Sequence, residues 1–143
     1  MPLPPMPAWL IDYTTARDAF TTGSAILRTK IKAMCVAGTI KFCACEKPSF
    51  RNNLVIRGPF YADQNCSCNL SHDIVEIASE LPDVVSGKKM HPSDHSARLI
   101  VACAIHHNYG LVSSKTGLYL SPIELGAHQG VTCLSLLQFS ALV

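Results

Sequence analysis

Asp12 is the residue of this chain best placed to do chemistry, because it ends a short apolar run. Residues 8–12 read Ala-Trp-Leu-Ile-Asp, the pattern of a buried parallel strand with a functional side chain at its carboxyl end. In open α/β sheets, ligands bind beyond the carboxyl ends of the strands. We therefore predict that Asp12 converges there with the residues around Glu46 and with residues 113–115. The alternative is that Asp12 only caps the turn that follows it.

Two Cys-x-Cys pairs indicate a second kind of chemistry. They are Cys43 with Cys45, and Cys66 with Cys68. Four thiolates suit a tetrahedral structural zinc site, and residues i and i+2 of a strand share one face. Zinc ligands are usually spaced by two to four residues, however, and a buried strand accepts cysteine as a small apolar side chain. The alternatives are therefore a zinc-stabilised interaction module and a core that contains several free thiols.

The elements that must position these residues follow from the spacing of apolar side chains. Short apolar segments predict strands over 8–12, 39–45, 109–114 and 131–135. Helical spacing predicts helices over 22–37, 74–81, 97–105, 121–128 and 136–142. Loops are expected over 46–53, 63–69 and 86–93. The stretch 54–70 is left open, with a strand expected over 54–56 as one interpretation. Strands that alternate with helices pair in parallel through right-handed crossovers. The predicted fold is a three-layer α/β/α sandwich around a mostly parallel sheet.

Length and composition predict one domain with a sizeable core. The chain has 143 residues, of which 48% are hydrophobic. We expect a proline-rich leader over residues 1–7 and a single domain over 8–143. The net charge of +2 lacks the basic bias of a protein that holds nucleic acid through its phosphates alone. Charged residues make up only 15%, against about 25% in a typical domain, so we expect a covered surface such as that of a homodimer.

The cellular compartment is predicted from the same composition. No apolar run reaches the ~18 residues of a membrane helix, and the start has no basic segment before a long apolar stretch. The odd count of seven cysteines, without an export signal, favours free thiols. We therefore expect a cytoplasmic chain with no membrane segment.

Both ends of the chain resemble the PIN-domain ribonucleases, which include the VapC-type toxins. Residues 99–107 (Leu-Ile-Val-Ala-Cys-Ala-Ile-His-His) and 111–114 (Leu-Val-Ser-Ser) resemble a buried helix and the strand that follows it in that family. Residues 130–139 (Gly-Val-Thr-Cys-Leu-Ser-Leu-Leu-Gln-Phe) resemble its closing strand and helix. Residues 9–15 (Trp-Leu-Ile-Asp-Tyr-Thr-Thr) resemble its opening strand with the first metal-binding Asp. The resemblance covers about half of the chain and consists mostly of apolar signatures.

This resemblance implies a PIN-like fold and a metal-dependent endoribonuclease, such as the toxin of a toxin-antitoxin pair. Family members hold Mg²⁺ or Mn²⁺ with three or four carboxylates, and the bound cation activates water for attack on an RNA phosphate. The residues implied here as metal ligands and catalytic groups are Asp12, Glu46 and Asp94. The implied partners are RNA and an antitoxin protein. On structural grounds alone, Asp94 is also a good N-cap and Glu46 a solvated loop residue.

The sequence departs from the family pattern at two acidic positions. The acid that opens the buried helix in the family aligns with Ala97, whereas Asp94 lies one helical turn earlier. The fourth acid falls near Lys115, and a lysine cannot ligate Mg²⁺. These departures keep a further alternative open, a PIN-like binding protein that has lost its chemistry.

Overall fold

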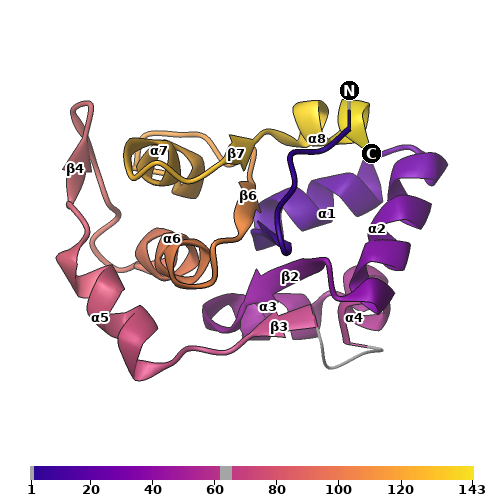
Figure 1. Ribbon diagram of the computed structural model, residues 1–143, viewed down its shortest axis with the longest axis horizontal. Coiled ribbons are helices and arrows are strands. Elements are labelled where there is room, and N and C mark those ends of the chain that lie inside the picture. Colours follow the sequence, from indigo (N-terminus) through magenta and orange to yellow (C-terminus); the bar gives the residue numbers. More distant parts are fainter. Residues whose placement is uncertain (1, 62–65) are drawn as a thin grey trace.

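The central sheet is built from very short strands that are apolar enough to be buried on both faces. The computed structural model describes residues 2–61 and 66–143 (Figure 1). The five strands, in the order in which they lie in the sheet, are β3 (Ser67–Cys68), β2 (Ile40–Cys43), β1 (Trp9–Ile11), β6 (Gly110–Val112) and β7 (Cys133–Leu134). Every pair of neighbours is parallel. All three residues of β1 are buried, as expected for a central parallel strand.

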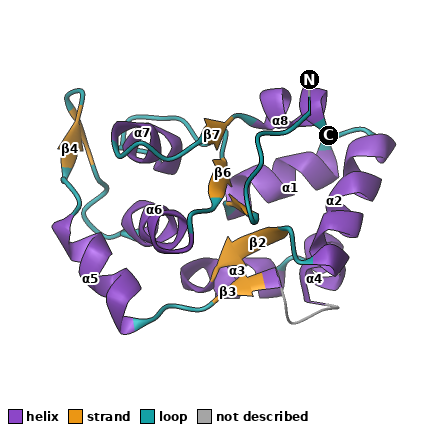
Figure 2. Cartoon of the chain, in the orientation of Figure 1, coloured by secondary structure: helices purple, strands orange, loops and turns teal. Residues whose placement is uncertain are grey.

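Helices cover both faces of this sheet, which confirms the predicted three-layer α/β fold (Figure 2). On one face lie α1 (Tyr13–Thr21), α2 (Ala25–Ala37), α3 (Lys47–Asn52), α4 (Leu54–Tyr61) and α8 (Leu136–Leu142). On the other face lie α5 (His72–Glu80), α6 (Ser96–His107) and α7 (Pro122–His128). Leu10 and Leu111 face the second group, whereas Ile11 and Val112 face the first, as the alternation of side chains along a strand requires.

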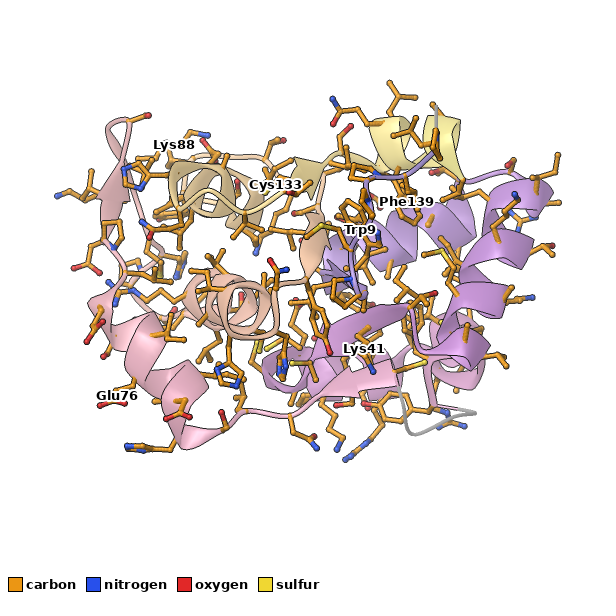
Figure 3. All side chains as sticks on the ribbon, viewed as in Figure 1. Trp9, Lys41, Glu76, Lys88, Cys133 and Phe139 are labelled. Atoms are coloured by element: carbon orange, nitrogen blue, oxygen red, sulfur yellow. The ribbon has the colours of Figure 1, made fainter. Side chains whose placement is uncertain are left out.

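Aromatic packing fixes the first face of the sheet. Phe42 of β2 stacks on Phe50 with ring centroids 4.2 Å apart. Trp9 of β1 meets Phe139 of α8 edge to face, at 6.2 Å between centroids, and the two are seen close together in Figure 3. These contacts join the first strand, the second strand and the last helix into one core. The position of Asp12, which follows β1, is therefore set by a rigid element.

Four segments differ from the sequence prediction. The expected strand at 54–56 is wrong, because these residues begin α4, whose first amides at Val55 and Ile56 face the side-chain oxygen of Asn53. The expected loop at 46–53 is mostly α3, which has a proline in its first turn. The strand expected over 39–45 ends at Cys43 and is followed by η1 (Ala44–Glu46). The expected loop at 86–93 contains half of a hairpin, β4 (Val84–Val85) paired with β5 (Lys88–Lys89).

Two other predicted segments, the loop at 63–69 and the leader at 1–7, include residues that the structure does not describe. The loop predicted at 63–69 lies partly outside the described residues, and its described part includes β3. Residues 2–7 of the leader form no helix or strand, and Leu3 and Met6 pack partly buried against the core. Within residues 2–61 and 66–143, no helix is both long and apolar enough to cross a membrane.

Candidate functional site

Asp12 lies at the junction of β1 and α1, as a buried carboxylate. Its residue is 1% exposed, and it occupies the N-cap position of α1. Neither carboxylate oxygen accepts a hydrogen bond of good geometry from the described residues. Burial raises the pKa of Asp12, and the nearby hydroxyls of Thr15 and Ser113 offset this only in part. Because its oxygens accept no hydrogen bond of good geometry from the described residues, the Asp12 carboxylate has lone pairs available to bind a cation.

Glu46 brings a second carboxylate to the same helix end. It ends η1, directly after β2, and its Oε1 accepts a hydrogen bond of 3.0 Å from the amide of Tyr13. Burial raises the pKa of Glu46 to about 8, and the charge of Asp12 is the next largest cause. The structure thus brings Asp12 and Glu46 together at the N-terminus of α1, where the helix dipole favours negative charge.

The segment that follows β6, residues 113–115, lies against the start of α1 and so belongs to the same site. The amide of Ser114 donates to Thr15 Oγ1 at 2.8 Å, and Ser114 Oγ accepts from the amide of Leu136 at 2.7 Å. Ser113 is fully buried and its Oγ has no partner among the described residues. The predicted convergence of residues 113–115 with Asp12 is therefore present. Thr15 was not predicted, because its role depends on a contact 99 residues away along the chain.

Lys115 brings a positively charged side chain to this site. Its Nζ lies 3.5 Å from Asp94 Oδ2, and its positive charge also acts on Asp12 and Glu46, against the larger effect of their burial. Asp94 lies just before α6, and its Oδ1 accepts from the Ser96 amide at 3.0 Å. Burial alone would raise the pKa of Asp94, but the Ser96 contacts and Lys115 outweigh it and the pKa falls below its ordinary value. Asp94 is thus at the rim, ion-paired with Lys115.

The donor set suits a cation that is held by few protein ligands. Within the part of the chain that the structure describes, no three His, Cys, Asp or Glu side chains are grouped so as to hold a metal ion. Mg²⁺, however, is often bound through one or two carboxylates, with water and substrate phosphate as its other ligands. Asp12 and Glu46 provide such a pair, and the unpartnered oxygens of Asp12 fit that role. Asp94 can join them only if Lys115 releases it.

The cysteines do not form the zinc site that their spacing suggested. Cys43 and Cys68 are register partners on adjacent strands and lie on the face that α6 covers. Cys66 belongs to the opposite face, where its thiol donates to the Cys35 carbonyl at 3.3 Å. Cys43 instead contacts Cys103 of α6, with the Sγ atoms 3.5 Å apart. Cys43, Cys45 and Cys68 belong to one core and Cys66 to the other, so among the described residues the four thiols do not converge, and the alternative of a core that contains free thiols is favoured over the zinc-stabilised module.

Comparisons with known proteins bear on the fold. No protein-family model matches the chain, and no curated protein matches it significantly. Among solved structures, it is similar to a chain of the crystal structure of VapBC2 from Rickettsia felis bound to a DNA fragment from their promoter. The TM-score is 0.58 at 10% sequence identity, over 90% of this chain and 98% of that chain. This likeness supports the PIN-like architecture predicted from the sequence.

Proposed function

We propose that this chain is a PIN-like, cytoplasmic, metal-dependent endoribonuclease that binds Mg²⁺ or Mn²⁺ through Asp12 and Glu46. The observation that carries the proposal is the buried carboxylate pair at the carboxyl edge of a parallel sheet. Burial raises the pKa of both groups, the charge of Asp12 raises that of Glu46 further, and Asp12 lacks hydrogen-bond partners among the described residues. A cation between them relieves that repulsion. The seven free cysteines suit a reducing compartment.

Each residue of the site has a separate task in this proposal. When bound, the divalent cation supplies an activated water and neutralises charge on the scissile phosphate. Glu46 is kept in place by the Tyr13 amide, and Thr15 is held against the segment that follows β6. Lys115 provides a fixed positive charge beside the carboxylates, suited to a phosphate oxygen. Asp94 orients Lys115 through their ion pair, and would be a further ligand for the cation where an RNA phosphate binds Lys115 in its place.

The cleavage experiment compares wild type with Asp12→Asn on single-stranded and structured RNA. We expect cleavage by wild type with Mg²⁺ or Mn²⁺, none in EDTA, and loss of cleavage in Asp12→Asn, because the amide cannot replace a charged ligand. Asp73→Asn, at an exposed position in the first turn of α5, is the matched control and should cleave like wild type. Cleavage in EDTA, or equal cleavage by Asp12→Asn, contradicts the proposed function.

A PIN-like binding protein without chemistry is the second candidate, and the ion pair of Lys115 with Asp94 favours it. The Lys115 ammonium group lies 3.5 Å from the Asp94 carboxylate, the third carboxylate of the site, and takes the place that a metal ion would need there. In the same experiment this candidate predicts RNA that is bound but remains intact at every metal concentration.

Exposed apolar side chains support a protein partner, either a second copy of the chain or an antitoxin-like protein. They lie on α2, at Ile26 (73% exposed) and Val36 (70%), and at the start of α4, at Leu54 (77%) and Val55 (59%). The two helices contact each other, so these residues lie on neighbouring elements. We expect a homodimer by light scattering at micromolar concentration, which Ile26→Lys with Leu54→Lys should dissociate. A monomeric wild type would rule out the homodimer.

A further inference from the structure

A cavity of about 190 Å³ lies next to the candidate site, between the segment that precedes α6 and the segment that follows β6. Its lining includes His91, Asp94, Lys115, Leu118, Tyr119 and Leu120. It therefore shares Lys115 and Asp94 with the candidate site. Its aromatic wall, formed by His91 and Tyr119, has no part in holding the cation.

The aromatic wall of the cavity is held in place before any ligand binds. The rings of Tyr119 and His91 meet edge to face, with centroids 4.5 Å apart. His91 Nδ1 in turn lies 3.1 Å from the Ser93 amide, which donates to it. The amide of Leu120 donates to the Lys89 carbonyl at 2.8 Å and so fixes the loop against the β4–β5 hairpin. A ligand that stacks on Tyr119 therefore pays little to order this loop.

The chemistry of the lining identifies the class of ligand. Tyr119 is 44% exposed, so part of its ring is free to stack, and Lys115 places a positive charge at the same cavity. The volume is below the roughly 300–1,000 Å³ of pockets that hold drug-sized ligands, which suits one ring system. Stacking on an aromatic side chain beside a cation that meets the backbone is how proteins bind single-stranded nucleic acid.

We propose that this cavity is a nucleobase subsite, in which one base of single-stranded RNA stacks on Tyr119 while its phosphate meets Lys115. The proposal rests on the proposed function, because it places that phosphate beside the carboxylate pair. It also restricts the substrate, since a base within a duplex is not free to enter the cavity. Single-stranded RNA and unpaired loops are therefore the expected substrate class.

The test measures binding of a labelled six-nucleotide oligouridylate in EDTA, so that no metal-dependent step contributes. We expect Tyr119→Ala to weaken binding by about 5- to 100-fold, because each stacked base contributes on the order of that factor. Tyr119→Leu should lose as much, since it keeps apolar bulk but no aromatic face. Tyr119→Phe should bind within about two-fold of wild type, and so should Leu137→Ala, a control at an 81% exposed residue of α8.

Competition separates a base site from a plain anion site. Uridine monophosphate should displace the oligonucleotide at lower concentration than ribose 5-phosphate or inorganic phosphate. Equal competition by the three, unchanged binding in Tyr119→Ala, full retention in Tyr119→Leu, or no binding by wild type in EDTA each overturns the subsite. None of these results alters metal-dependent cleavage and its loss in Asp12→Asn, so the failure of the subsite is distinct from the failure of the nuclease.

Discussion

Replacing Glu46 by Gln should stabilise the metal-free protein by about 2–4 kcal/mol at pH 8.5 and by less than about 1 kcal/mol at pH 5. In the folded protein, burial and then the charge of Asp12 raise the pKa of Glu46 from 4.5 to about 8. Below pH 4.5 both the folded and unfolded states hold the proton. As the pH rises toward 8, the unfolded state releases it first, so the wild type progressively loses stability. Glutamine has no proton to release and avoids this loss.

Urea unfolding at the two pH values, with EDTA present, measures the difference. Glu76→Gln is the control, because Glu76 is exposed on α5 and points away from the chain (Figure 3), and its effect should be the same at both pH values. Saturating Mn²⁺ should stabilise the wild type and leave Glu46→Gln unchanged, because the amide is a poorer ligand for a hard cation. An equal gain at pH 5 and pH 8.5 would contradict the raised pKa of Glu46, and with it the burial of its carboxylate beside Asp12.

Apolar periodicity predicted the elements that position this site. The run of residues 8–12 predicted β1, and the helices predicted over 74–81 and 121–128 are present as α5 and α7. The first helix after Asp12 was missed, although Ala16 and Phe20 are buried in it at helical spacing. The helix α4 was missed because Leu54 and Val55 are exposed, so apolar residue types there do not indicate a buried face.

The candidate site was predictable only where it follows strand ends. Asp12, Glu46 and Lys115 follow β1, β2 and β6, and the carboxyl ends of parallel strands share one edge. The thiols show the limit of local spacing. Cys66 lies just outside β3 and on the other face from Cys68, and Cys103 reaches Cys43 only through the packing of α6. The spacing of cysteines along the chain therefore does not show which thiols lie close together in the folded protein.

Gly110→Ala should destabilise the protein by about 3 kcal/mol, at the upper end for adding one methyl group to a packed core. A Cβ at Gly110 would lie 2.4 Å from two ring atoms of Trp9, its register partner on β1. The indole has no room to retreat, because Trp9 is 2% exposed and packs against Phe139 (Figure 3). The strain therefore falls on β1 and β6, the two strands that carry Asp12 and Ser113.

Gly58→Ala is the matched control, with a small expected effect. Gly58 lies within α4, and apart from its chain neighbours a Cβ there would meet nothing within 4 Å. Alanine should change stability by less than about 1 kcal/mol, because its higher helix propensity is offset by Pro59, which disfavours helical geometry for a preceding residue that has a Cβ. Trp9→Leu in the Gly110→Ala background should cost less than Trp9→Leu alone, because the smaller side chain makes room for the new methyl group. Urea unfolding measures all four variants. Additive losses from Trp9→Leu and Gly110→Ala would contradict the contact between the two strands, and with it the rigid placement of Asp12.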